Sequence, residues 1–112
     1  MDVVEIKRFD ICLITLDPTV GYEIKKTRPC LIISPNSLNL SRLKTIIIAP
    51  LTSTIRNNFP TRTLIEFQGQ KGQVALDQLR AIDCTRIIKV LGSIKTPKIK
   101  QEIVEILQAL FT

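Results

Sequence analysis

The residue types missing from this sequence restrict the chemistry that it can perform. No histidine occurs among the 112 residues, which excludes a Ser-His-Asp triad, a Cys-His dyad and a histidine acid–base pair. Carboxylates, the usual ligands of catalytic divalent metals, are scattered singly along the chain; they include Asp10, Asp17, Glu23, Glu66, Asp77 and Asp83. The sequence therefore predicts neither a metal site nor a bound cofactor.

The distribution of charge gives the first positive indication of function. The formal net charge is +6, and residues 24–65 contain no acidic residue. The basic residues of that stretch are Lys25, Lys26, Arg28, Arg42, Lys44, Arg56 and Arg62. A basic face of this kind is the electrostatic footprint of a protein that binds a phosphate backbone. The same pattern also fits a solvated surface that has no partner.

The three cysteines, Cys12, Cys30 and Cys84, do not form a recognisable site. Their odd number and their spacing match no metal-binding or redox motif. Cys12 and Cys30 lie within apolar runs, which is typical of small buried side chains. The sequence leaves the role of Cys84 open.

Most of the chain has the pattern of short β-strands. Apolar runs of strand length, bounded by proline, glycine or polar clusters, predict strands over residues 9–16, 30–33, 45–49, 63–67 and 73–82. We expect the first two runs to form a hairpin around the long polar loop DPTVGYEIKKTRP, a candidate substrate-binding loop. Ser34 begins a turn or a short helical stretch, Gly69 and Gly72 bracket a turn, and residues 87–94 give no clear signal.

The final segment, TPKIKQEIVEILQALF, predicts an amphipathic helix. Thr96 is expected as the N-cap and Pro97 as the first helical residue. The apolar residues of this segment recur at helical spacing, which places them on one face of the helix. They are Ile99, Ile103, Ile106, Leu107 and Leu110. Lys98 and Lys100 oppose the macrodipole in the first turn, so packing must hold the helix. These lysines are either tolerated there or contact a polyanion.

Together these elements predict a mainly β fold with a C-terminal α-helix, arranged as one small SH3-like antiparallel barrel spanning residues 1–112. The length suits a single domain with a modest core. No stretch approaches the ~20 apolar residues that cross a bilayer, and the N-terminus lacks a secretory pattern. We therefore expect a cytoplasmic protein with no membrane association.

Four segments, in this order, resemble the MazF/PemK (Kid) family of bacterial toxin endoribonucleases. They are RFDICLITLDPTVGYEIKKTRPCLIIS, IIIAPLTS, ALDQLRAID and the terminal helix. The most specific pieces are D-P-T-x-G-x-E-x-x-K-T-R-P from Asp17 to Pro29 and A-P-x-T-S from Ala49 to Ser53. The resemblance implies the toxin of a type II toxin–antitoxin system, a homodimer that cleaves single-stranded RNA (mRNA) at specific sequences without a metal. It also implies neutralisation by an acidic antitoxin of the MazE/PemI type.

By position, the resemblance places the family's catalytic arginine at Arg28 and its catalytic threonine at Thr52. The chemistry agrees, because RNA is cut when the ribose 2′-hydroxyl attacks the adjacent phosphorus, provided that phosphorane charge is stabilised and the 5′-oxygen leaves in line. Arg28 can offer a planar fork to two phosphate oxygens, and Thr52 can hydrogen-bond the same phosphate. Because arginine is a poor proton acceptor, we interpret Arg28 as a charge stabiliser, and the general base stays unidentified.

Further residues are expected to line the RNA groove through backbone approach, stacking and polar contacts. They are Gly21, Tyr22, Glu23, Lys25, Ser53 and Gln78. Glu23 could act as the base, contact RNA bases, or pair with Lys25 or Lys26. Tyr22 would stack on a base or anchor its loop. Gln78, expected within a strand, would contact RNA or form hydrogen bonds within the protein.

Two other functions from different classes fit parts of the pattern. A gyrase poison of the CcdB type, whose fold is similar to that of this family, would bind a protein partner and leave RNA uncut; the T-R-P and P-x-T-S motifs argue against it. A non-catalytic SH3-like module for RNA or a peptide would keep the basic groove but tolerate loss of Arg28 and Thr52.

Two segments depart from the family pattern. The first is RFD, where the family often has R-G-D, and the second is TIRNNFPTR. The second departure leaves the preferred RNA sequence undetermined.

Overall fold

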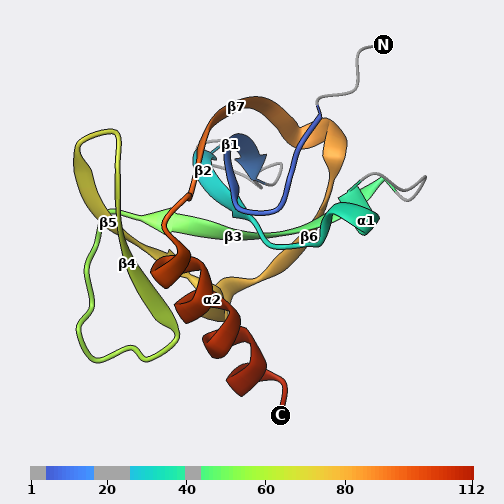
Figure 1. The fold of residues 1–112 in the computed structure, drawn as a ribbon. Coiled ribbons are helices and arrows are strands. Elements are labelled where there is room, and N and C mark those ends of the chain that lie inside the picture. The colour runs from blue at the N-terminus through green and yellow to red at the C-terminus, as the bar shows by residue number, and fades with distance from the viewer. Residues whose placement is uncertain (1–4, 17–25, 40–43) are drawn as a thin grey trace, which may run out of the picture.

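The chain folds into a curled antiparallel sheet with a helix lying across it (Figure 1). The computed structural model describes residues 5–16, 26–39 and 44–112. The strands are β1 (Asp10–Leu16), β2 (Lys26–Ile32), β3 (Thr45–Thr52), β4 (Arg62–Phe67), β5 (Gln70–Ala75), β6 (Arg80–Asp83) and β7 (Ile87–Ser93). The helices are α1 (Asn36–Asn39) and α2 (Pro97–Leu110), and two short 3-10 turns cover Leu76–Gln78 and Cys84–Arg86.

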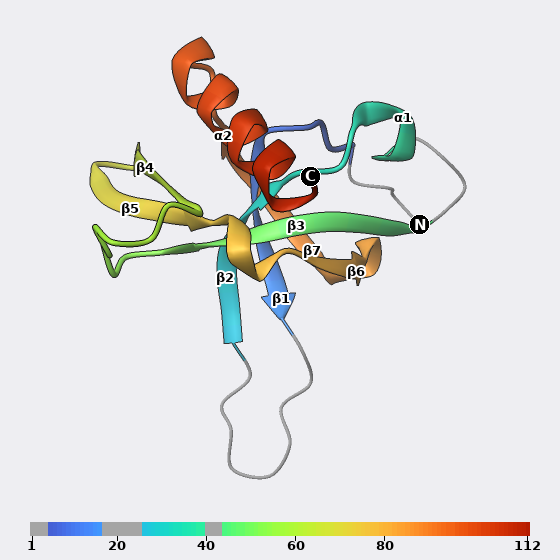
Figure 2. The ribbon, with the colours of Figure 1, turned by 90° about the horizontal axis from the view of Figure 1, so that it is seen from below.

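Strand β3 holds the two parts of the sheet together. The neighbouring strands run in the order β4-β5-β3-β2-β1-β7, and β6 pairs with the first half of β3. The last residues of β3, Leu51 and Thr52, pair instead with β5. The β4–β5 hairpin therefore projects to one side of β1 and β2, and β3 runs between the two parts (Figure 2).

The strands β1, β2 and β3 contribute side chains to apolar clusters on both faces of the sheet. Side chains such as Cys12, Cys30 and Ile48 enter one apolar cluster, and the alternate side chains, among them Ile11 and Leu31, enter a second. Because successive residues of a strand point to opposite faces, a strand covered on both sides needs a nearly continuous apolar run. This explains the apolar runs of β1 and β2, whereas in the run IIIA of β3 the residue Ile47 is exposed.

Helix α2 covers the second cluster, as its amphipathic pattern predicts. Ile103 is completely buried there, beside Ile65 of β4 and Val74 of β5. Thr96 is the N-cap residue, but its side chain makes no capping hydrogen bond, so packing holds the helix. The ammonium of Lys100 lies 5.4 Å from the centre of the Phe9 ring, which gives this first-turn lysine a structural contact.

The mainly β fold with a terminal helix is confirmed, with corrections at the element ends. Phe9, expected as the first strand residue, has a φ of 72°, a left-handed conformation that a strand does not allow, and β1 begins at Asp10. β2 begins at Lys26, well before Cys30. Gly72 lies within β5, so only Gly69, with a φ of 77°, belongs to the turn.

The single strand expected over residues 73–82 is wrong. β5 ends at Ala75, a 3-10 turn follows at Leu76–Gln78, and β6 begins at Arg80. Both strands use the same edge of β3, but in different registers. The 3-10 turn at Leu76–Gln78 takes the backbone out of the extended conformation between the two pairings with β3. Over the described residues, no helix is long and apolar enough to span a membrane.

Candidate functional site

The register of two neighbouring strands brings Arg28 and Thr52 level with each other. β2 and β3 are antiparallel, and Cys30 pairs with Pro50. Continued by two residues, this register places Arg28 opposite Thr52, on the face of the sheet that Cys30 also occupies. Both side chains are half-buried. The pairing of β2 with β3, which ends at Cys30 and Pro50, thus brings the T-R-P and A-P-x-T-S motifs together.

The ladder between β2 and β3 ends beside these two residues. Pro29 and Pro50 have no N–H to donate, and proline is confined to places where a ladder stops or is interrupted. Beyond Pro50, β3 pairs with β5 on its other edge, Leu51 with Val74. The two strands therefore part, and a cleft opens between β2 and the β4–β5 hairpin.

The cleft consists of two adjoining hollows that share Arg28, Thr52 and Thr54. The first, of about 360 Å³, is lined by Arg28, Pro29, Leu51, Thr52, Ser53, Thr54, Ile65, Phe67, Gln70, Lys71 and Gly72. The second, of about 180 Å³, is lined by Arg28, Pro50, Thr52, Thr54, Arg56, Arg62, Ala75 and Gln78. Arg28 and Thr52 thus form part of the wall common to both.

The hydroxyl of Thr52 is oriented by its own turn. Its Oγ1 accepts a hydrogen bond of 3.1 Å from the backbone N–H of Thr54. A hydroxyl has one proton and two lone pairs, so this bond uses a lone pair and leaves the proton of Thr52 free to be donated. A threonine held in this way can donate to an anionic oxygen in the cleft.

Three arginines, Arg28, Arg56 and Arg62, line the second hollow, and the charges of two of them are not balanced by an ion pair among the described residues. Arg62 is neutralised by Asp77, with 2.9 Å between Nε and Oδ1, and the hydrogen bond from Arg62 holds the pKa of Asp77 below its ordinary value. Within the part of the chain that the structure describes, neither Arg28 nor Arg56 forms an ion pair. Their two charges are therefore available to an anion such as a phosphate.

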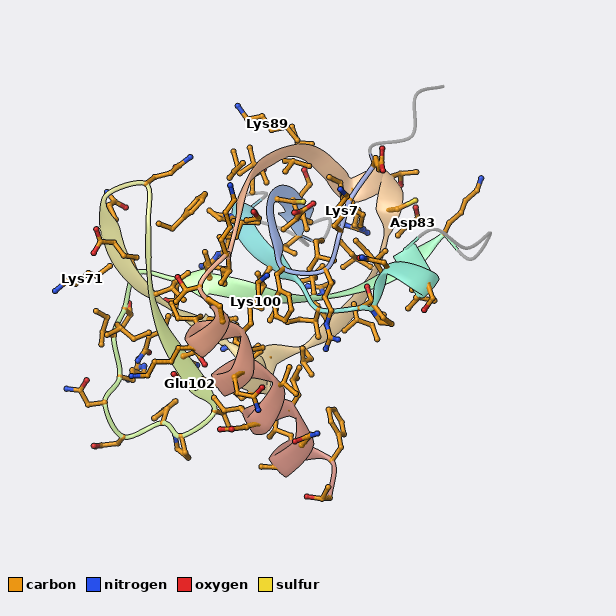
Figure 3. All side chains as sticks on the ribbon, in the orientation of Figure 1. Lys7, Lys71, Asp83, Lys89, Lys100 and Glu102 are labelled. Atoms are coloured by element: carbon orange, nitrogen blue, oxygen red, sulfur yellow. The ribbon has the colours of Figure 1, made fainter. Side chains whose placement is uncertain are left out.

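A glycine allows the hairpin to lie against the segment that contains Thr52. A Cβ added at Gly72 would lie 2.7 Å from the carbonyl oxygen of Thr52, closer than such atoms approach in proteins. Lys71, on the same strand, extends outward at the side of the molecule formed by the hairpin (Figure 3). The backbone position of Thr52 thus depends on the absence of a side chain at residue 72.

The structure brings together the four predicted site residues that it describes. Arg28, Thr52, Ser53 and Gln78 all line the cleft. The expectation that Gln78 lies within a strand is wrong, because it is exposed in the 3-10 turn between β5 and β6. The other predicted residues lie outside the described residues; they are Gly21, Tyr22, Glu23 and Lys25.

The basic stretch does not gather on one surface. Arg28, Arg56 and Arg62 line the cleft, but Lys44 lies just before β3, where its charge contributes to lowering the pKa of Asp83. Asp83 and Lys71 lie on opposite sides of the molecule (Figure 3). The sequence analysis did not identify Arg56 and Arg62 as site residues. The only sequence signal for them was their membership of the basic stretch, within the segment TIRNNFPTR.

The buried thiols lie outside this site. Cys12 and Cys30 are paired across β1 and β2, and burial raises the pKa of each to about 12. Such thiols are unreactive at neutral pH, in agreement with the structural role expected from the sequence. Among residues 5–16, 26–39 and 44–112, no three His, Cys, Asp or Glu side chains gather as they would around a metal ion.

The fold and the cleft define a small antiparallel barrel protein with a cationic site where its central strands part. The chain belongs to the family described as the PemK-like, MazF-like toxin of type II toxin-antitoxin system, whose model matches residues 7–111. The family resemblance inferred from the two motifs is thereby confirmed.

Named relatives and solved structures agree with this assignment. The chain is 38% identical over 87 residues to Endoribonuclease PemK of Escherichia coli, a match covering 70% of this chain and 62% of that protein. It is 25% identical over 103 residues to Endoribonuclease MazF9 of Mycobacterium tuberculosis, covering 85% and 87% of the two chains. The crystal structure of MazF from Deinococcus radiodurans has a TM-score of 0.74 at 25% identity and covers 97% of each chain. A MazE-MazF structure from the same organism has a TM-score of 0.76 at 24% identity, over 97% of this chain and 96% of that one.

Proposed function

We propose that this toxin is an endoribonuclease that cuts single-stranded RNA, in particular mRNA, by attack of a ribose 2′-hydroxyl on the adjacent phosphate. The observation that carries the proposal is the placement of Arg28 and Thr52 in the shared wall of a cationic cleft. The names of its relatives, Endoribonuclease PemK and Endoribonuclease MazF9, support the same reaction.

The two residues act on the same phosphate in different ways. The guanidinium of Arg28 stabilises the negative charge that develops on the phosphorane, which is the step where preorganised cations contribute most. Thr52 donates its free proton to a phosphate oxygen, since Oγ1 already accepts from Thr54. Ser53 and Gln78 offer polar contacts to flanking nucleotides on either side of this wall. The nucleophile belongs to the RNA, so the reaction requires neither a metal nor a histidine.

The first experiment tests the reaction itself. Purified protein is incubated in excess EDTA with a long RNA, and with a matched RNA that carries a 2′-deoxy sugar before the cut. We expect cleavage at specific sequences that leaves a 2′,3′-cyclic phosphate or its 3′-phosphate, and no cleavage of the deoxy substrate. Comparable cutting of the deoxy substrate would refute 2′-hydroxyl attack. Inhibition of gyrase with intact RNA would favour the CcdB-type alternative.

The second experiment tests the two residues. Arg28→Ala should lower kcat by about 10²-fold or more if the arginine stabilises phosphorane charge, and Thr52→Val, which keeps the side-chain shape, should lower it through loss of the hydroxyl. Lys89→Gln removes one positive charge from an exposed residue of β7 that lines neither hollow of the cleft, and it serves as the control. Full activity of both site variants, with RNA binding retained, would identify a non-catalytic binding module instead.

The partners follow from the same cleft. We propose a homodimer in the bacterial cytoplasm whose cationic groove is blocked by a small acidic antitoxin of the MazE/PemI type, since a flexible acidic segment mimics phosphates. The MazE-MazF structures from Deinococcus radiodurans provide the precedent. Changing Lys25, Lys26 and Arg28 together to glutamine should weaken both RNA and antitoxin binding and flatten their salt dependence. Unchanged antitoxin affinity would place the inhibitory contact elsewhere.

A further inference from the structure

Gln73 is a polar side chain buried in the strand that faces Thr52. It lies in β5, directly paired with Thr52 of β3, and only 5% of it is exposed. Its Oε1 accepts a hydrogen bond of 3.0 Å from the backbone N–H of Arg56, and its Nε2 donates one of 3.3 Å to the backbone carbonyl of Arg56. The side-chain amide therefore pairs with Arg56 much as a neighbouring strand would.

This pairing fixes the middle of an otherwise exposed segment. Every residue from 54 to 60 is exposed. Within the segment, the N–H of Phe59 donates to the carbonyl of Arg56, and the N–H of Arg62 donates to that of Phe59. These are local turns, whereas the amide of Gln73 connects the segment to a buried strand. The place of Arg56 relative to the cleft is thus set from β5.

The side chain of Arg56 is held where a phosphate could reach it. Its guanidinium carbon lies 5.6 Å from the centre of the Phe59 ring, and that of Arg62 lies 5.0 Å from the same ring. Cations stacked on an aromatic ring lose part of their freedom. Arg62 is neutralised by Asp77, but Arg56 has no ion pair among the described residues and lines the hollow that also contains Arg28.

We propose that Arg56 binds a backbone phosphate next to the one that is cut, and that Gln73 is the positioning residue that holds Arg56 there. The inference rests on the proposed RNA cleavage and adds a second phosphate contact to it. Without the Gln73 amide, the N–H of Arg56 loses its hydrogen-bond partner, and the carbonyl of Arg56 keeps only the bond from the N–H of Phe59. They regain hydrogen bonds most cheaply by moving into water, which withdraws the arginine from the cleft while β5 keeps its ladder.

The test compares Gln73→Met, Arg56→Gln, the double variant and the control Lys89→Gln. Gln73→Met keeps the length of the side chain at this buried position but removes both hydrogen bonds. Gln73→Asn, one methylene too short to reach Arg56, provides a second variant that keeps a polar amide. For each protein, kcat and KM are measured on a single-stranded RNA, and Kd on the same RNA with a 2′-deoxy sugar at the cut.

Each single variant should raise KM and Kd by about tenfold, the size expected for one charge-assisted contact, and leave kcat within about twofold of the wild type. The double variant should resemble either single variant, because both remove the same contact. Arg56→Gln should also make the dependence of RNA affinity on salt concentration less steep, by the amount expected for the loss of about one phosphate contact. Lys89→Gln, with the same loss of charge, should change none of these values.

Two results would overturn the inference: Gln73 variants that bind the deoxy RNA as tightly as the wild type, or effects of the Gln73 and Arg56 variants that simply add. A uniform loss of kcat in the Gln73 variants, with KM unchanged, would also contradict a role through Arg56. Failure of the wild type to cut RNA would refute the proposed function instead, and the Kd comparison would still decide the role of Gln73.

Discussion

Replacing Gly72 with alanine should both destabilise the protein and damage the site. The new Cβ would lie 2.7 Å from the carbonyl oxygen of Thr52, an atom of the backbone that cannot rotate away. Gly72 has no positive φ, so alanine would otherwise stabilise the chain by about 0.4–1 kcal/mol through its unfolded state. Overpacking of a fitted site costs about 1–3 kcal/mol. The net expectation is a loss of about 1–2 kcal/mol, or a fall in Tm of about 4–8 °C.

The atom that must retreat belongs to Thr52, so activity should fall as well. Under the proposed function, a small displacement of Thr52 should lower kcat by about tenfold or more, measured on single-stranded RNA. Gly69→Ala is the matched control, because a Cβ there meets nothing within 4 Å but the residue has a φ of 77°. It should cost about 1 kcal/mol from backbone strain and leave kcat unchanged. A Tm of Gly72→Ala at or above that of the wild type, or equal losses of kcat in the two variants, would refute the reasoning.

Two further predictions use the titratable groups. The hydrogen bond from Arg62 holds the pKa of Asp77 below its ordinary value. The ionised Asp77 therefore stabilises the folded protein above about pH 4, and this contribution is lost as the pH falls through the lowered pKa. Thermal melts should therefore show a larger fall in Tm between about pH 5 and about pH 3 for the wild type than for Asp77→Asn; equal falls would contradict this. Burial raises the pKa of Cys12 and of Cys30 to about 12, so a disulfide reagent should modify one thiol of the native protein, Cys84, and all three after denaturation. Rapid modification of a second native thiol would disprove the burial argument.

The sequence predicted the strands best where both faces are buried, because a continuous apolar run of four to eight residues is typical of a buried strand. It shortened β2 and β3, since Pro29 and Pro50 read as breakers. In the structure these prolines lie within the strands, at the place where the ladder between them ends and donors are not needed. The sequence did not predict the break between β5 and β6. The break exists because both strands pair with the same edge of β3 at different positions, which is a property of the tertiary fold.

The candidate site was predictable only in part. Arg28 and Thr52 lie in motifs, and strand register brings the motifs together. Arg56 and Gln73 carry no local pattern, and the contact between them joins a loop to a buried strand. Gln73 stands directly before the apolar run VAL, but sequence spacing does not identify which backbone group its amide binds. The placement of Arg28 and Thr52 in one wall of the cleft was therefore predictable from the sequence, whereas the contact between Arg56 and Gln73 was not.

The pairing of β1 with β7 also has a consequence for how the protein folds. Asp10 lies opposite Ser93, and Ile11 shares its apolar cluster with Ile103, so one edge and one face of β1 are completed only by the last part of the chain. Contacts this distant in sequence close late and slow the folding of β-rich proteins. During synthesis the motifs with Arg28 and Thr52 emerge long before the strand and helix that complete the sheet. A nascent chain therefore contains the residues of the cleft before it has the rigid framework that makes them a site.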